Sequence, residues 1–132
     1  MIGLDTNVLV RYLVQDDLVQ AAAATRLVET RCTKEAPGFV NRIVLCELVW
    51  VLESAYRYPK DSIAAVLDRL LRTAELVIED AESAWLALQA YRGLGVDFPD
   101  ALIGLANRDR GCEGTATFDG RATRLAVFFS PS

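Results

Sequence analysis

The residues of this chain that could do chemistry are its carboxylates. The chain has no histidine, and its three cysteines are widely spaced and include no Cys-x-x-Cys pair. These features exclude a Ser-His-Asp triad, a histidine general base, a zinc finger and a disulfide framework. Four acids occupy positions from which a carboxylate could serve one site: Asp5, Glu47, Asp100 and Asp119.

Asp5 and Asp119 each come directly after a segment that we expect to be a strand. The first segment is Ile2-Gly3-Leu4 and the second is Thr115–Phe118. Ligands of parallel sheets bind at the carboxyl ends of the strands, so both side chains could reach one site. Aspartate is also a common helix cap and turn former, and this leaves a purely structural role open for each.

Glu47 lies in an apolar environment. Nine of the ten residues from 43 to 52 are apolar, so the helix that contains them is expected to be buried on nearly all sides. An unpaired buried carboxylate costs several kcal/mol. Glu47 should therefore be protonated, paired with an arginine such as Arg11, or bound to a cation. Its neighbour Cys46 is expected to be a small core residue.

Asp100 lies in the first turn of a helix that begins after Asp97, with Pro99 close to its start. Asp97 and Asp100 have the spacing of a capping box, although aspartate replaces the usual glutamate or glutamine. The helix dipole also favours acids in the first turn. One residue of this pair could cap the helix while the other serves a site.

A divalent cation would allow the four acids to converge. Two like charges about 5 Å apart repel by roughly 3 kcal/mol at an effective dielectric constant near 20, so four carboxylates would not all stay ionised unaided. Carboxylate ligands without histidine favour hard ions such as Mg²⁺ or Mn²⁺. One or two such ions in a cleft suit phosphoryl and phosphodiester chemistry.

The composition sets the broad class of the protein. A chain of 132 residues with 52% hydrophobic residues is expected to form one domain over residues 1–132 with a proper core. The net charge of −4 argues against a simple basic surface for nucleic acid, but the chain is neutral without the four candidate acids. There is no apolar run of about 18 residues and no signal peptide is visible, so we expect a protein of the reducing cytosol without a membrane anchor.

The apolar pattern predicts helices that alternate with short strands. Apolar residues recur at helical spacing between Ile63 and Leu71, which predicts an amphipathic helix starting near Asp61. Leu76-Val77-Ile78 is continuously apolar, as expected for a strand buried on both faces. The alternation predicts an α/β fold with a mainly parallel sheet. Further helices are expected over 7–14, from Asp16 or Asp17 to about Arg31, from Asn41 to about Tyr58, from Asp80 to about Arg92 and from Asp97 to before Gly111, and further strands over 38–40 and 126–129.

Four segments together resemble the PIN domain family, and within it the VapC-type toxins of bacterial and archaeal toxin–antitoxin pairs. Each segment is weakly specific alone, but all four occur in the family's order and the resemblance covers the whole chain. They are Ile2-Gly3-Leu4-Asp5-Thr6-Asn7, Cys46-Glu47-Leu48-Val49-Trp50-Val51-Leu52, Asp97-Phe98-Pro99-Asp100-Ala101-Leu102-Ile103 and Thr117-Phe118-Asp119.

The resemblance implies a three-layer α/β/α domain with a central, mainly parallel sheet of about four to five strands. It also implies an Mg²⁺-dependent endoribonuclease in which Mn²⁺ can substitute. The catalytic carboxylates that hold one or two ions would be Asp5, Glu47, Asp100 and Asp119, and some relatives vary at the position of Asp119. Polar residues that match positions beside the family's site are Thr6, Asn7, Asp97 and Thr117.

Partners are implied by the same resemblance. The substrate would be a structured RNA such as a tRNA or an rRNA hairpin, and a small VapB-like antitoxin would bind a groove and present basic residues to the acidic pocket. Trp50, Tyr12 and residues 21–24 could line that groove, although core packing is the expected role of Trp50. A homodimer is also implied. Arginines near the site in sequence that could contact phosphate are Arg11, Arg42, Arg121 and Arg124.

Three other functions fit the sequence less well. A phosphatase of the haloacid dehalogenase type needs a second aspartate two positions after Asp5, where Asn7 stands, and a positioned lysine, for which Lys34 and Lys60 are the only candidates. A receiver-like signalling domain needs an acidic pair near the first strand and a late lysine, and neither is present. A PIN fold used only for binding is the non-catalytic alternative, against which the four intact acids argue.

Overall fold

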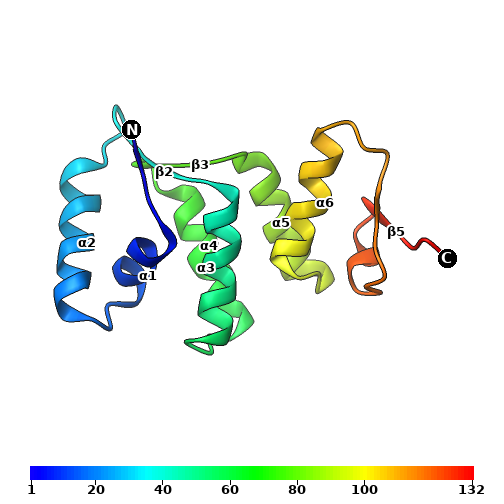
Figure 1. The fold of residues 1–132 in the computed structure, drawn as a ribbon, viewed down its shortest axis with the longest axis horizontal. Coiled ribbons are helices and arrows are strands. Elements are labelled where there is room, and N and C mark those ends of the chain that lie inside the picture. The colour runs from blue at the N-terminus through cyan, green and yellow to red at the C-terminus, as the bar shows by residue number, and fades with distance from the viewer.

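Six α-helices are interleaved with five short strands along the chain (Figure 1). A computed structural model describes all residues from 1 to 132. The predicted α/β class with parallel strands is confirmed. In chain order, the elements are β1 (Ile2–Gly3), α1 (Thr6–Val14), α2 (Leu18–Arg31), β2 (Gly38–Val40), α3 (Arg42–Ser54), α4 (Lys60–Arg72), β3 (Leu76–Ile78), α5 (Ala81–Leu94), α6 (Phe98–Asp109), β4 (Thr115–Ala116), a short 3-10 helix (Ala122–Arg124) and β5 (Phe128–Phe129).

All five strands pair in parallel, but they form two sheets rather than one. The first sheet has the order β1-β2-β3, with Gly38 opposite both Ile2 and Leu76. The second sheet contains only β4 and β5, with Thr115 opposite Phe128. The number of strands and their direction therefore agree with the prediction, whereas the single central sheet is replaced by a three-stranded and a two-stranded sheet.

The strands near the C-terminus are shorter than their apolar runs predicted. β4 ends at Ala116 instead of Phe118 because the chain turns at once. Thr117 Oγ1 accepts a hydrogen bond from the backbone N–H of Asp119 at 3.0 Å, which closes this turn. β5 likewise occupies only the second half of its expected range.

The helices lie side by side along the long axis of the molecule. α1 packs against α2 and α3, α4 packs against α5, and α5 packs against α6. Figure 1 shows the three-stranded sheet along the upper edge of the view, whereas β5 lies beyond α6 near the C-terminus. α3 contacts both α1 and α6, so it connects the N-terminal and the C-terminal parts of the fold.

Side-chain caps fix the starts of two helices, as the sequence predicted. Asp17 accepts a hydrogen bond from the backbone N–H of Gln20 at 3.0 Å and caps α2. Asn41 accepts one from the backbone N–H of Val44 at 2.8 Å and caps α3. These bonds satisfy donors that the first helical turn leaves without intrahelical partners.

Two other expected caps do not form. Asp80 precedes α5 in the left-handed conformation with a φ of 53°, and its side chain makes no capping hydrogen bond. Asp97 precedes α6 and also makes no side-chain cap, so the predicted capping box between Asp97 and Asp100 is wrong. Both acids of that pair are therefore free of a capping role at the start of α6.

α3 ends at Ser54, four residues before the predicted end at Tyr58. The Ser54 hydroxyl donates a hydrogen bond to the backbone carbonyl of Trp50 at 2.6 Å, within the last turn. Arg57 then adopts a φ of 53°, which reverses the chain before α4. Propensity alone does not reveal such a reversal, because the left-handed conformation usually falls on glycine or asparagine.

One core joins the helices to the three-stranded sheet. The predicted apolar stripe of α4 is confirmed, because Ile63, Leu67 and Leu70 are buried in it. The prediction that β3 is buried on both faces is wrong, because Val77 is 41% exposed between two buried neighbours. None of the helices has the length and apolar character that crossing a membrane would require.

Gly104 provides a test of how closely α6 packs on the C-terminal segment. A Cβ atom at Gly104 would lie 2.6 Å from a ring carbon of Phe128 and 2.7 Å from a methyl carbon of Val127. We predict that Gly104→Ala lowers the free energy of unfolding by about 1–3 kcal/mol through overpacking, as measured by denaturant titration.

The matched control is Gly93→Ala in α5, where a Cβ atom would meet nothing within 4 Å. Alanine has the higher helix propensity, so this variant should gain roughly 0.5–1 kcal/mol. A Gly104→Ala protein that is as stable as the Gly93→Ala protein would show that α6 and β5 are not in tight contact.

Candidate active site

Asp5 and Glu47 are linked through the backbone N–H and the hydroxyl of Thr6. Asp5 follows β1 and caps α1 by accepting a hydrogen bond from the backbone N–H of Thr6 at 2.8 Å. The Thr6 hydroxyl donates a hydrogen bond to Glu47 Oε1 at 2.9 Å. These three residues and the predicted polar residue Asn7 line a hollow of about 420 Å³ between α1 and α3. The first half of the predicted site is thereby assembled at the end of β1.

Glu47 is exposed, which corrects the prediction that α3 is buried on nearly all sides. The outer face of the helix carries Ile43, Glu47 and Trp50, and the two apolar side chains are 71% and 67% exposed. The inner face carries the buried residues Leu45, Leu48, Val49 and Leu52. Hydrophobic content therefore did not measure burial here, and the core packing expected for Trp50 is also wrong.

Three further acids gather around the start of α6. Burial raises the pKa of Asp97 and of Asp100 above the ordinary value for aspartate. The negative charges of Asp97 and Asp119 raise the pKa of Asp100 further, whereas the positive charge of Arg121 lowers it. The direction of these shifts shows that the three carboxylates repel one another and that Arg121 partly offsets their charge.

Local hydrogen bonds hold Asp119 in its turn. Its backbone N–H donates to Thr117 Oγ1, and its carboxylate accepts a hydrogen bond from the backbone N–H of Arg121 at 2.9 Å. The predicted polar neighbour Thr117 therefore shapes the turn that carries the acid. The same turn brings Arg121 back toward Asp97 and Asp100.

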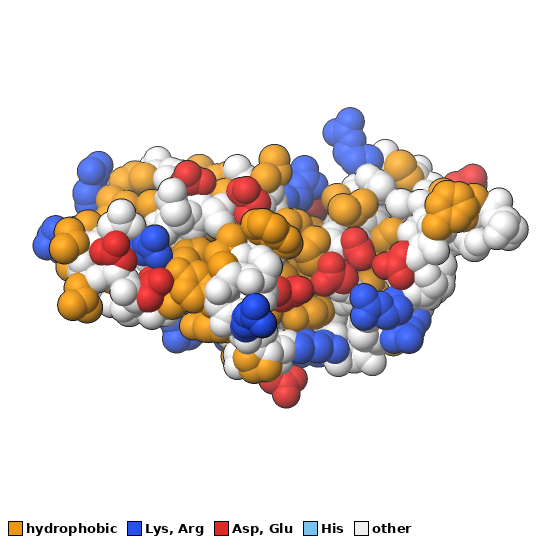
Figure 2. All heavy atoms as spheres, turned by 60° about the horizontal axis from the view of Figure 1, so that its bottom comes forward, with side chains coloured by type: hydrophobic (Ala, Val, Ile, Leu, Met, Phe, Trp, Pro, Cys, Tyr) orange, Lys and Arg blue, Asp and Glu red, His pale blue; other side chains and the backbone are white.

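α3 carries Glu47 and also contacts α6, at whose start the other acids lie. Cys46 is half-buried on α3 next to Glu47, and burial together with the charges of Asp97 and Asp100 raises the pKa of its thiol. Cys46, the neighbour of Glu47 in the chain, is therefore close enough to the start of α6 to respond to the charges of its acids. Figure 2 shows a row of acidic side chains on this face of the molecule, with basic side chains directly beside it.

The carboxylates fit a divalent cation in kind, although they do not form a closed ligand set in this structure. They supply only hard oxygen donors, which suit Mg²⁺ and Mn²⁺, and a cation would relieve the repulsion that raises the pKa of Asp97 and Asp100. No group of three or more acidic or cysteine side chains is close enough to surround one ion. The four predicted ligands are arranged instead as two neighbouring groups.

Comparison with known protein families shows to which family the chain belongs. The profile of the PIN domain matches residues 2–127, nearly the whole chain. The chain belongs to the PIN domain family. No curated protein and no solved structure matches it significantly. PIN domains are generally nucleases that need a divalent metal ion, so the class of chemistry inferred from the carboxylates agrees with the family.

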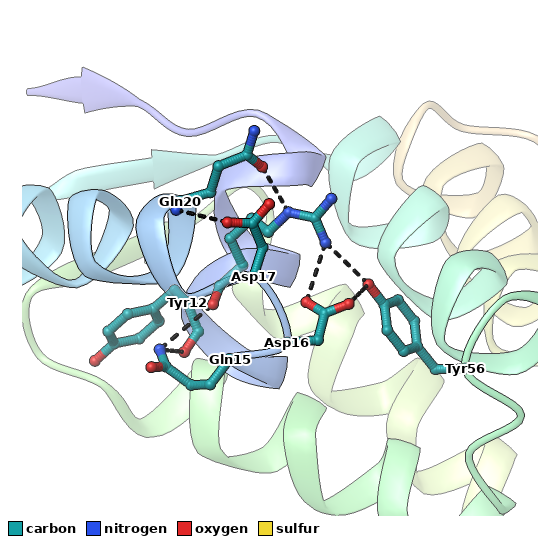
Figure 3. A network of polar contacts seen from close by, with 7 residues as sticks. Tyr12, Gln15, Asp16, Asp17, Gln20 and Tyr56 are labelled. Carbon is teal, nitrogen blue, oxygen red and sulfur yellow. Dashed lines mark hydrogen bonds and ion pairs between the residues drawn. The ribbon is translucent and has the colours of Figure 1, made fainter.

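Arg11 of this PIN domain is held by other protein groups (Figure 3). Its guanidinium donates to Gln20 Oε1 at 2.7 Å, to Asp16 Oδ1 at 3.0 Å and to the Tyr56 hydroxyl at 3.1 Å. The Tyr56 hydroxyl in turn donates to Asp16 Oδ2 at 2.7 Å. This network joins the α1–α2 turn to the segment after α3 beside the hollow of Asp5. It also replaces the ion pair with Glu47 that the sequence left open.

The other predicted arginines fall into two groups. Arg42 is engaged at the start of α3, where it lies 3.6 Å from Glu79 and 3.9 Å from Asp80. Arg121 and Arg124 both line a groove of about 660 Å³ that also reaches Asp97. A role of these four side chains in binding RNA stays a prediction, and the geometry favours the second pair for it.

The same groove contains charged residues that the sequence did not assign to the nuclease site, namely Glu53, Arg57 and Lys60. Glu53 ends up close enough to Asp97 that the charge of Asp97, together with burial, raises its pKa. The only available signal was two basic residues within four positions around Pro59. That signal did not reveal that the α3–α4 turn faces the acids of α6.

The mutual charge effects at the start of α6 can be tested by titrating individual carboxyl groups by NMR. Arg121→Gln should raise the pKa of Asp97 and of Asp100, because it removes the positive charge that lowers both. Asp119→Asn should lower both pKa values, because it removes a negative charge that raises them. Arg31→Gln, on the exposed end of α2, is the control and should change neither pKa. Equal shifts in the control would mean that net charge rather than proximity is responsible.

Proposed function

We propose that this PIN domain is a metal-dependent endoribonuclease of the VapC toxin type that hydrolyses phosphodiester bonds in structured RNA such as tRNA or rRNA. The observation that supports this function most directly is the arrangement of the two acidic groups around α3 in a chain whose family generally consists of nucleases. Asp5 and Glu47 form one group, and Asp100 and Asp119 with Asp97 form the other.

In this proposal, Asp5, Glu47, Asp100 and Asp119 would hold Mg²⁺, or Mn²⁺ in its place. A bound divalent ion makes its water more acidic and neutralises charge on the phosphate, and this is the chemistry it would supply here. The chain's own side chains prepare the site. Thr6 orients Glu47 through its hydroxyl, the Thr117 turn holds Asp119, and Arg121 offers a positive charge to a non-bridging phosphate oxygen.

We further propose a VapB-like antitoxin as the partner that neutralises the toxin. The exposed side chains of Ile43 and Trp50 stand on the same face of α3 as Glu47. An amphipathic segment could cover the two apolar side chains while a basic residue reaches the carboxylate. Exposed Ile103 on α6 adds apolar area that a second copy of the chain could cover, which supports the proposed homodimer.

The cytoplasm is the compartment that suits this proposal. All three cysteines are free, and Cys112 is exposed. Unpaired thiols of this kind persist in a reducing compartment. The RNA substrates that we propose would be encountered there.

The direct test of the proposal is cleavage of a panel of structured RNAs by purified, antitoxin-free protein in Mg²⁺ or Mn²⁺. Asp5→Asn and Asp100→Asn should each lower the cleavage rate by more than about 100-fold, because loss of a direct ligand should exceed the 10–100-fold effects seen for residues that only support ligands. EDTA should abolish cleavage. Glu29→Gln on exposed α2 removes the same charge away from the site and should leave the rate unchanged.

Two results would contradict the proposal. Full activity of a folded Asp100→Asn protein would remove Asp100 from the site. If the wild-type protein cleaves no RNA and also binds no Mn²⁺ by calorimetry, the carboxylates do not form a metal site and the domain acts as a non-catalytic binding module.

Asp100 should also decrease stability at neutral pH, as expected for an acid retained for function. Its pKa is raised in the folded state, so ionisation destabilises the fold as the pH rises from the ordinary aspartate range through the raised pKa. Asparagine does not ionise and avoids this loss. Asp100→Asn should therefore melt at a higher temperature than wild type at pH 7, with the difference vanishing in acid. Asp61→Asn, at the exposed start of α4, should show no such gain. A lower melting temperature for Asp100→Asn would contradict the sign of the effect.

A further inference from the structure

A groove of about 660 Å³ opens directly beside the acids of α6. Its wall is built from the end of α3, the α3–α4 turn, the start of α4, the end of α5 with the α5–α6 turn, and residues at both ends of the 3-10 helix. Asp97 and Arg121 line the groove, and their charges also act on Asp100. A strand that enters the groove would therefore continue into the candidate active site.

The residues that line the groove include more cations than carboxylates, although the chain as a whole is acidic. Four cationic side chains line it, and the only carboxylates among its lining residues are Glu53 and Asp97. None of the four cations lies within 4.0 Å of a carboxylate oxygen, because the only residues that form such ion pairs through a basic side chain are Arg11, Arg42, Arg72 and Arg92. Arg121 acts on Asp97 and Asp100 only at longer range. A local excess of two positive charges thus stands in a chain of net charge −4. The four cations are Arg57, Lys60, Arg121 and Arg124.

Two of these cations are positioned by neutral groups. The Lys60 ammonium lies 5.2 Å from the centre of the Tyr91 ring, and Arg124 donates a hydrogen bond to the backbone carbonyl of Leu94 at 3.2 Å. Gly95 leaves room for this arginine, because a Cβ atom there would lie 2.9 Å from its Nη1 atom. Such contacts orient a cation without neutralising it, so its charge remains available to an anion.

The remaining groove features match a nucleic acid strand better than an isolated anion. The cations of the groove come from two parts of the chain that are distant in the sequence, Arg57 and Lys60 around Pro59 and Arg121 and Arg124 after β4. The half-buried ring of Tyr58 also lines the groove and provides a face for stacking a base. A positively charged groove combined with an aromatic side chain is the usual arrangement for binding single-stranded nucleic acid without sequence preference.

We propose that this groove binds the phosphodiester backbone of a single-stranded RNA segment next to the bond that is cleaved, with Arg57 and Lys60 as phosphate-binding residues. The inference rests on the proposed nuclease function, because the groove delivers the strand to Asp97 and Asp100. It gives a domain with net negative charge a specific place at which RNA is attracted rather than repelled.

The test measures binding of a labelled, mixed-sequence single-stranded RNA in EDTA, where the proposed cleavage is silent, over a range of salt concentrations. The double variant Arg57→Gln/Lys60→Gln should weaken binding at least tenfold at low salt. It should also lower the slope of log affinity against log salt by about 1.4, because each lost phosphate contact removes about 0.7 from the slope for single strands. The charge-preserving variant Arg57→Lys should keep most of the affinity.

The matched control is Arg26→Gln/Arg31→Gln, which removes the same two charges from the exposed surface of α2. It should leave the slope nearly unchanged. The proposal would be overturned by equal losses in the two double variants, by an unchanged slope in the groove variant, or by a wild-type protein that binds no RNA. Displacement of the RNA by inorganic phosphate at matched ionic strength would also overturn it, because the groove would then take a single phosphate group.

Cleavage assays in Mg²⁺ separate this inference from the proposed function. If the wild-type protein cleaves RNA and the groove variant binds and cleaves equally well, the groove assignment is wrong and the nuclease stands. If binding depends on Arg57 and Lys60 but no RNA is cleaved and no Mn²⁺ is bound, the groove stands and the nuclease function is wrong.

Discussion

Repulsion between carboxylates is the physical interaction that dominates the candidate site of this domain. Asp97 and Asp100 are fixed at the start of α6, and Asp119 is held in a turn by hydrogen bonds of its backbone N–H and of its carboxylate. α6, which follows Asp97 directly and carries Asp100, is held in place by its packing on α5 and α3. The repulsion is therefore retained in the folded state, and Arg121 offsets only part of it. A site of this kind is less favourable for folding than a neutral one, and binding of a cation would relieve the repulsion.

The sequence predicted the fold wherever local chemistry decides the structure. The caps at Asp17 and Asn41 and the stripe of α4 depend on residues within a few positions of one another, and all were confirmed. The end of α3 was predicted wrongly because Arg57 adopts a left-handed conformation, which arginine rarely does, and the chain reverses there. Division of the strands into two sheets could not be predicted, because pairing depends on how distant segments pack and the strands are only two or three residues long.

The sequence selected the residues of the candidate site, whereas their arrangement in space could not be predicted from it. Strand ends and helix starts can be located in a sequence, so Asp5 and Asp100 could be selected. The burial of Glu47 could not be predicted correctly, because the apolar composition of α3 does not reveal that the outer face of this helix is exposed to solvent. The groove lined by four cations could not be predicted from the sequence for a related reason. Its cations come from the α3–α4 turn, the first residue of α4 and the segment after β4, and only the tertiary fold brings Arg57 into the same groove as Arg121.

The exposure of Trp50 has a spectroscopic consequence. The chain contains two tryptophans, and Trp85 is partly buried with the Arg72 guanidinium 4.9 Å from its ring centre. Trp50, in contrast, stands in solvent three residues from Glu47, on the same side of the helix. Its indole emission therefore responds to whatever covers the outer face of α3, while that of Trp85 supplies a steadier background. The domain thus carries an intrinsic fluorescent reporter beside one of its candidate catalytic carboxylates.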